Sequence, residues 1–184
     1  SLMLAEHGFS PLLLERGGPV SRRIERNRSF LTNRNLDPEC NVLFGLGGAG
    51  TFSDGKLTTG IRHKWLSNVL EILVQCGAPD DIRYSAKPHI GTDILITVVE
   101  NLVQHIEKAG GTVKTGTKVD GISSEKGALK SIETGSGRTH TQVAVLAIGH
   151  SARDTLQMLR DAGLEIVPKP FQMGVRVEHP QKWL

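Results

Sequence analysis

Apolar residues recur along much of the chain with the spacing expected of helices. In residues 65–76 and 93–109 they return every three or four positions, which predicts two amphipathic helices. Weaker versions of the same pattern predict three further helices, over residues 2–7, 20–28 and 152–162.

Residues that start or stop helices flank several of these segments. Gly8 and Gly163 follow the first and last predicted helices, and Gly110-Gly111 follows the longest one. Thr92 or Asp93 is placed to cap the start of that longest helix with a side-chain oxygen. The helix boundaries are therefore marked on the chain itself.

Short runs of apolar or β-branched residues, bounded by glycine, predict strands between the helices. Residues 11–15 and 143–148 are continuously apolar, as in buried parallel strands. A strand over residues 112–116 and a small antiparallel β meander lie between them. The meander strands are expected at 118–123, 128–134 and 139–142, and two more strands at 164–167 and 172–178. The order predicts an α/β fold with a β-rich insertion before the last core strand.

Glycine is concentrated in residues 41–60, too densely for the interior of a helix or strand. Backbone N–H groups in such a loop can approach a phosphate or a flavin ring closely. Thr51, Ser53 and Lys56 add polar side chains, but Leu57 after Lys56 excludes the P-loop pattern. The alternative is a purely structural Ω-loop.

The carboxylate of Glu15 stands at the end of the first predicted strand. In a dinucleotide-binding βαβ unit, an acidic residue about 20 positions after a G-x-G-x-x-G turn accepts from ribose hydroxyls. Only 14 residues precede Glu15, so we expect the first strand and the phosphate-binding turn to lie before Ser1. The alternative is that Glu15 simply ends a buried strand at the surface.

Five stretches together resemble a known family. They are LLLERG from Leu12, NVLFGLGGAGTFSDGKLTT from Asn41, AKPHIGTD from Ala86, VLAIGHSARD from Val145 and KPFQMGVRVEHP from Lys169. In this order they are similar to the uncharacterised bacterial FAD-dependent dehydrogenases, flavoproteins of the two-dinucleotide-binding-domain family. The resemblance implies a partial FAD/NAD(P)-binding Rossmann-like domain, here as a fragment of a longer oxidoreductase that lacks the amino-terminal GxGxxG and the carboxyl-terminal part.

The resemblance also implies roles for individual residues. Glu15 resembles the ribose-binding acid, with Arg16 beside it, and Val119 resembles the position whose backbone meets adenine. The loop from Gly47 to Ser53 resembles the segment that passes the pyrophosphate and the flavin, and Ala147–Gly149 the strand end near the cofactor. The expected cofactor-binding set is Glu15, Arg16, Gly47, Gly48, Ala49, Gly50, Thr51, Ser53, Lys56, Val119, Ala147 and Gly149. Leu46 departs from the polar residue expected in that loop.

The resemblance divides the chain into three parts. Residues 1–60 are expected to be a partial FAD-binding segment, and 61–150 a helical segment, the β meander and a core strand of the same domain. Residues 151–184 would start a second, substrate or cap region. Because the phosphate-binding turn is missing, we expect this chain to retain FAD weakly.

Composition and charge narrow the class further. The 184 residues include 21 glycines, 38% are hydrophobic, and the formal net charge is +3, as in an ordinary globular protein. No apolar run is long enough for a membrane helix and no signal peptide is visible. Two distant cysteines, Cys40 and Cys76, predict reduced thiols in a cytoplasmic protein.

The sequence leaves partners and chemistry partly open. Six arginines between residues 16 and 34 suggest RNA binding, but they lack interleaved aromatic residues, so this is the less favoured hypothesis. The same arginines could equally neutralise cofactor phosphates or form a solvated face. No metal site is expected, because His89 and Asp93 have no third ligand. His89, His150 and Lys87 are candidates for contact with the flavin, while no catalytic residue is assigned.

Three functions therefore stand as hypotheses. The first is flavin-mediated hydride transfer between an unknown small-molecule substrate and FAD, with NAD(P)H as a candidate co-substrate. The second is a non-catalytic nucleotide-binding or interaction module, and the third a basic RNA-associated flavoprotein. Exposed sheet edges would also permit self-association.

Overall fold

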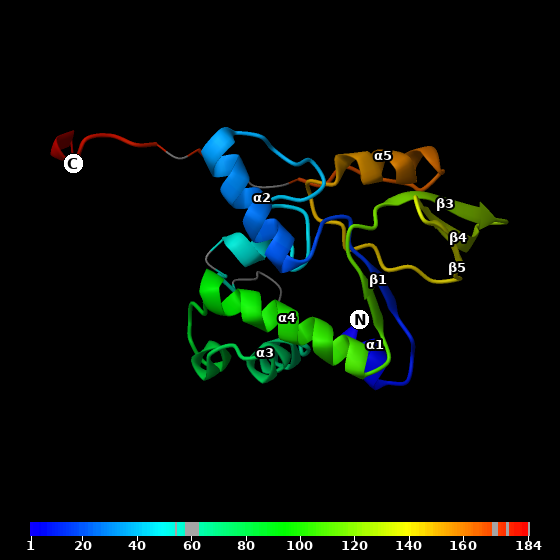
Figure 1. The fold of residues 1–184 in the computed structure, drawn as a ribbon, viewed down its shortest axis with the longest axis horizontal. Helices are drawn as coiled ribbons and strands as arrows, with labels where there is room; N and C mark the ends of the chain where they lie inside the picture. The colour runs from blue at the N-terminus through cyan, green and yellow to red at the C-terminus, as the bar shows by residue number, and fades with distance from the viewer. Residues whose placement is uncertain (54, 58–62, 171–172, 176, 184) are drawn as a thin grey trace.

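The fold is that of a computed structural model, which describes residues 1–53, 55–57, 63–170, 173–175 and 177–183. It is a mixed α/β structure with one parallel and one antiparallel sheet. Figure 1 shows helices α3 and α4 in the lower part of the view, with α2, α5 and the antiparallel sheet above them. Within these ranges no helix combines the length and apolar character needed to cross a membrane.

The parallel sheet consists of β1 (Leu12–Leu14) and β2 (Thr112–Lys114), with Leu13 opposite Val113. A helix precedes each strand: α1 (Leu2–Glu6) before β1 and α4 (Thr92–Lys108) before β2. Glycines with positive φ, Gly8 at +82° and Gly110 at +95°, turn the chain from helix to strand. The prediction of these glycines as helix stops is confirmed.

A hydrophobic core forms where α3 (Leu66–Gln75), the short helix η2 (Asp80–Arg83) and α4 meet. The apolar face of α4 supplies Leu95 and Val98, which pack on Ile82 and Ile90. The apolar spacing predicted helices over residues 65–76 and 93–109. Helices α3 and α4 begin and end within one residue of these bounds, so both predictions are confirmed. The core supports one side of the glycine-rich loop.

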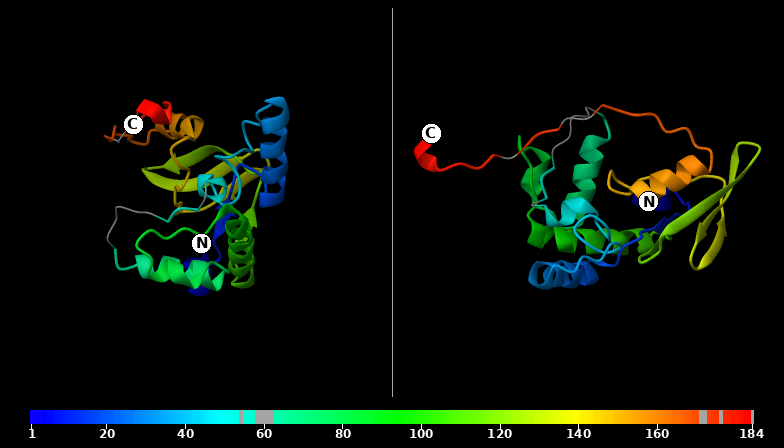
Figure 2. Two further views of the ribbon diagram at one scale, coloured as in Figure 1. Left: turned by 90° about the vertical axis from the view of Figure 1, so that its left-hand side faces the viewer. Right: turned by 90° about the horizontal axis from the view of Figure 1, so that it is seen from above.

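The antiparallel sheet has the predicted meander form, with β3 (Val119–Glu125), β4 (Ala128–Thr134) and β5 (Gly137–His140) as neighbours in that order. Lys126 and Gly127 join β3 to β4, and both have positive φ, as a two-residue hairpin turn requires. Helix α5 (Arg153–Asp161) lies beside β3. The meander projects from the rest of the chain, as the right-hand view of Figure 2 shows.

The predicted strand over residues 143–148 is wrong. The segment has no regular secondary structure, and Val143 and Val145 are 77% and 81% exposed. An apolar run forms a strand only where a neighbour pairs its backbone groups, and no described strand lies beside this one. The prediction used composition alone and did not establish such a neighbour.

The two later strands are also wrong as far as the structure describes them. Residues 164–167 are extended chain without a strand, and so are 173–175, 177 and 178. Residues 172 and 176 of the second prediction lie outside the described residues. After α5 the next regular element in the described chain is the short helix η3 (Gln181–Trp183).

Three finer expectations need correction. Neither Thr92 nor Asp93 caps α4, because Gly91, with a φ of +87°, occupies the cap position. The helix predicted over 20–28 is α2 (Val20–Asn33), which continues for another turn and ends at Arg34 in the left-handed region. Strand β1 is only partly buried, because its sheet has two strands rather than the several of a parallel core.

Candidate nucleotide-binding site

Glu15 joins the end of β1 directly to the glycine-rich loop. Its Oε1 atom accepts hydrogen bonds from the backbone N–H of Gly17 at 2.8 Å and of Gly45 at 2.9 Å. Gly17 follows the strand, and Gly45 belongs to the loop, 30 residues after Glu15. The two sequence features therefore lie side by side in the structure.

Two glycines make this close approach possible. A methyl group on Gly17 would overlap the backbone N and Cα of Gly45, so only hydrogen fits there. The backbone continues the contact, because Leu46 N–H donates to Gly18 O at 3.0 Å. The loop thus lies flat against the turn that follows β1.

The guanidinium of Arg23 holds the loop from inside. Helix α2 places this fully buried side chain under the loop, where it donates to four carbonyl oxygens. They belong to Asn41 at 3.1 Å, Val42 at 3.0 Å, Leu46 at 2.6 Å and Gly48 at 2.9 Å. The guanidinium also lies 4.7 Å from the ring centre of Phe52.

The RNA-binding hypothesis placed Arg23 on a basic surface, but its side chain is fully buried, so this part of the hypothesis is wrong. Its burial lowers the pKa of Arg23 through loss of solvation, although an arginine stays protonated at such a site. Val20 is also buried, three residues earlier and thus on the same face of α2. In the sequence, the three-residue spacing of Val20 and Arg23 on a helix beside a glycine-rich loop was the signal that could have indicated the burial of Arg23.

The outer side of the loop remains open. Gly47, Ala49, Gly50 and Ser53 are exposed and Gly48 is half-buried, as expected for residues that face a ligand. Thr51 differs, because its side chain is fully buried under Gly47. Its hydroxyl has no hydrogen-bond partner among the described residues. In this structure Thr51 does not present its hydroxyl to a surface ligand.

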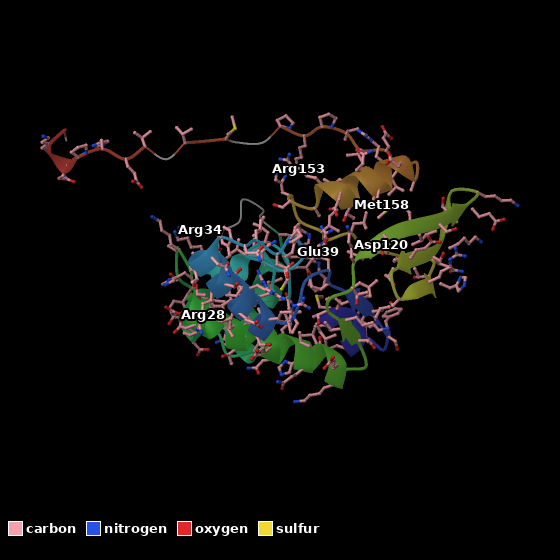
Figure 3. All side chains as sticks on the ribbon, turned by 45° about the horizontal axis from the view of Figure 1, so that its top comes forward. Arg28, Arg34, Glu39, Asp120, Arg153 and Met158 are labelled. Atoms are coloured by element: carbon pink, nitrogen blue, oxygen red, sulfur yellow. The ribbon has the colours of Figure 1, made fainter. Side chains whose placement is uncertain are left out.

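Arg16 belongs to a ring of four charges, which we call the four-charge ring. It comprises Arg16, Glu39, Lys118 and Asp154. Arg16 Nε lies 2.9 Å from Glu39 Oε2, and its Nη1 lies 3.0 Å from Asp154 Oδ1. Lys118 Nζ closes the ring at 2.8 Å from Asp154 Oδ2 and 3.8 Å from Glu39 Oε1. Figure 3 shows Glu39 between α2 and the start of the meander, where Asp120 is labelled.

A pocket of about 350 Å³ adjoins this ring. Three basic side chains and one acidic one line it, together with the backbone of two glycines and the Cys40 thiol. The lining residues are Arg16, Gly18, Arg22, Glu39, Cys40, Gly116 and Lys118. A second hollow of about 250 Å³ shares Gly116 and Lys118 and extends to the base of the meander. Val119, the first residue of β3, follows Lys118 and therefore lies next to both hollows.

The four-charge ring predicts a specific acid sensitivity. Hydrogen bonds from Arg16 and Lys118 hold the pKa of Asp154 well below its usual range. A lowered carboxyl pKa stabilises the fold above about pH 4, and that contribution is lost as the pH falls through the native pKa. We expect Asp154→Asn to lower the free energy of unfolding by only about 1 kcal/mol at neutral pH, because solvent screens half-exposed ion pairs. The variant should also lose less stability than the original chain as the pH falls.

Chemical denaturation from pH 7 to pH 2 measures this effect. Asp161→Asn on the same helix is the control, because Asp161 is solvent-exposed and contacts only its own helix. An equal loss of stability between pH 7 and pH 2 in the original chain and in Asp154→Asn would contradict the assignment.

The tail of the loop lies beside the segment that carries His89. Lys56 forms an isolated antiparallel bridge with His89, and Leu57 N–H donates to Pro88 O at 2.8 Å. Lys56, Lys87 and His89 are all exposed. This places Lys87 and His89, two of the three candidate flavin-contacting residues, next to the loop, whereas His150 lies in the turn before α5; their role stays a prediction. The described ranges contain no group of three His, Cys, Asp or Glu residues placed to hold a metal.

Two predicted site residues are not brought to these features. Ala147 and Gly149 lie in the exposed segment before α5 and line neither hollow. Cys40 and Cys76 are both free cysteines, as predicted. Cys76 Sγ lies 3.6 Å from His105 Nδ1, but burial raises the pKa of the thiol, which disfavours a nucleophilic thiolate.

Comparisons with known proteins add one relative. No protein-family model matches the chain. A protein of Clostridium beijerinckii (strain ATCC 51743 / NCIMB 8052), described as an uncharacterized protein, is 44% identical over 182 residues. The alignment covers 99% of this chain and 34% of that protein. The chain is thus similar, along nearly its whole length, to about a third of this longer relative.

Proposed function

We propose that this chain is part of an FAD-dependent oxidoreductase and binds the adenosine and pyrophosphate portions of the cofactor. The observation that carries the proposal is the contact between Glu15 and Gly45. It unites an acidic strand end with a glycine-rich loop, the two features expected of a dinucleotide site with a Rossmann-like ancestry. The resemblance of the loop to flavoprotein sequences supports the same cofactor.

The charges and the space beside Arg16, the residue that follows Glu15, fit such a ligand. Arg16, Arg22 and Lys118 are positive groups beside a cofactor whose pyrophosphate is negative. The pocket of about 350 Å³ is at the lower end for small-molecule sites, which suits part of a dinucleotide. Gly18 and Gly116 line it with backbone alone, which permits close approach of a base or a ribose.

Each group has a defined task in this proposal. When bound, the flavin supplies hydride transfer with an organic substrate or NAD(P)H. Glu15 orients the ribose by accepting from a hydroxyl while its Oε1 atom stays tied to the loop. The basic side chains of the pocket orient the phosphates. The exposed side of the glycine-rich loop faces the pyrophosphate and the flavin, and no acid–base residue is assigned.

Titration of the chain with FAD and with riboflavin, followed by flavin fluorescence, tests the proposal. Riboflavin lacks the ADP portion, so we expect FAD to bind and riboflavin not to. Glu15→Gln should weaken FAD binding about tenfold or more, because it removes a charged hydrogen-bond acceptor. Glu25→Gln on the exposed face of α2 is the matched control and should leave the affinity unchanged.

Two other outcomes of the FAD titration would change this interpretation. Equal affinity for FAD and riboflavin, or no effect of Glu15→Gln, would overturn the proposed site. Tight FAD binding with a flavin that neither NADH nor NADPH reduces would exclude a nicotinamide co-substrate and leave an organic substrate or the non-catalytic nucleotide-binding module.

A further inference from the structure

The peptide groups around Arg23 have a fixed direction. Leu46 O and Gly48 O both point at the buried guanidinium. In a trans peptide the N–H of the following residue points the opposite way from the carbonyl. The N–H groups of Gly47 and Ala49 are therefore directed away from Arg23.

Both of these N–H groups belong to exposed residues. In the described part of the chain neither donates to a backbone or side-chain acceptor, whereas the N–H of Gly48 between them is used by Gly45 O at 2.9 Å. In the described structure, the N–H groups of Gly47 and Ala49, which have no acceptor, thus flank the N–H of Gly48, which is already bonded within the loop. Successive backbone donors of this kind, with a cation behind them, are suited to an anion.

We propose that Arg23 is a positioning residue, which turns the N–H groups of Gly47 and Ala49 outward to hold a phosphate-bearing anion. Under the proposed function, on which the ligand's identity rests, this anion is the pyrophosphate of the dinucleotide. The guanidinium touches no ligand. It acts by donating hydrogen bonds to the loop carbonyls. These carbonyls then point away from the ligand, and the N–H groups of Gly47 and Ala49 face it.

Helix geometry offers a precise way to remove one donor. Ala49 is the first residue of the short helix η1 (Ala49–Phe52), a position that accepts proline. Ala49→Pro deletes the N–H and leaves Gly48 O free to bind Arg23. The preceding Gly48 has an extended ψ of −166°, which is compatible with a following proline.

Calorimetric titration with inorganic pyrophosphate tests the inference. We expect Ala49→Pro to weaken binding about tenfold or more, the effect of one lost charge-assisted hydrogen bond. Thr92→Pro is the matched control, because it makes the same change at the first residue of α4, also after a glycine with positive φ. Arg23→Lys should also weaken binding, because an ammonium cannot reach four carbonyls in one plane.

A measurement on the unaltered chain keeps the test independent of folding. We expect pyrophosphate to shift the amide proton signals of Gly47 and Ala49 in a nitrogen-15 correlation spectrum, and that of Gly48 much less. In Arg23→Lys these shifts should be lost, while Arg28→Lys on the exposed face of α2 should keep them. Pyrophosphate binding that leaves both amide signals in place, or that Ala49→Pro does not weaken, would overturn the inference.

The outcomes separate the two proposals. FAD binding that depends on Glu15 but not on Ala49→Pro would retain the proposed function and reject the anion site. Pyrophosphate binding that depends on Ala49 in a chain that does not bind FAD would retain the anion site and reject the proposed function.

Discussion

Arg23→Met is expected to lower the free energy of unfolding by about 3–5 kcal/mol, because four carbonyl oxygens lose their charged hydrogen-bond donor at once. Methionine is flexible and occupies part of the space, but it donates no hydrogen bond. The carbonyls of Asn41, Val42, Leu46 and Gly48 would lose the donor that they now share. Denaturant unfolding monitored by circular dichroism measures the loss.

Arg28→Met on the same helix separates this effect from helix propensity and net charge. Figure 3 shows Arg28 on α2, and its side chain is exposed, so the change should stay within about 0.5 kcal/mol. If Arg23→Met were as stable as Arg28→Met, the guanidinium would not be the support of the loop.

Gly17→Ala is expected to cost about 3 kcal/mol and to weaken FAD binding together with stability. The new methyl group overlaps the backbone of Gly45, and backbone cannot rotate aside as a side chain can. Relief requires the loop to move away from β1, which lengthens the contact between Glu15 and the Gly45 N–H. Unfolding and FAD titration of the same variant measure both effects.

Gly135→Ala is the control for the general effect of removing a glycine. A Cβ there meets only Asp120 Oδ2, at 3.9 Å, and the glycine is not in the left-handed region. We expect stability within about 0.5 kcal/mol of the original chain. A stable Gly17→Ala chain with unchanged FAD affinity would show that the loop does not need its close contact with β1.

Local signals in the sequence predicted much of this fold. Apolar periodicity located α3 and α4, and glycines marked where helices α1, α4 and α5 end. The β meander was predicted because its strands pair with neighbours only a few residues away. Each of these features depends on interactions within about 20 residues of sequence.

The errors concern features that depend on distant neighbours. An apolar run such as 143–148 carries no record of which strand, if any, lies beside it. The burial of Arg23 depends on a loop 18 to 25 residues later, so the charge alone suggested a surface. The four-charge ring joins Arg16 to Asp154, 138 residues away, and no spacing rule predicts such a contact.

The candidate site was predicted in part. Placing Glu15 and the loop in one site needed the family resemblance, and the structure brings them into contact. The exposed face of Gly47–Gly50 agrees with a role in binding, whereas Thr51 is turned inward and Ala147 and Gly149 lie elsewhere. Arg22, which lines the pocket, belongs to the arginine-rich stretch that the sequence analysis considered, whereas Lys118 was missed because a single lysine in a basic chain carries no distinguishing signal.

A crystal structure of the chain bound to FAD tests the central claim most directly. Our account predicts electron density for the ribose beside Glu15, with the pyrophosphate within hydrogen-bond distance of the Gly47 and Ala49 N–H groups. Density for FAD at any other surface, with Glu15 and the glycine-rich loop unoccupied, would contradict it.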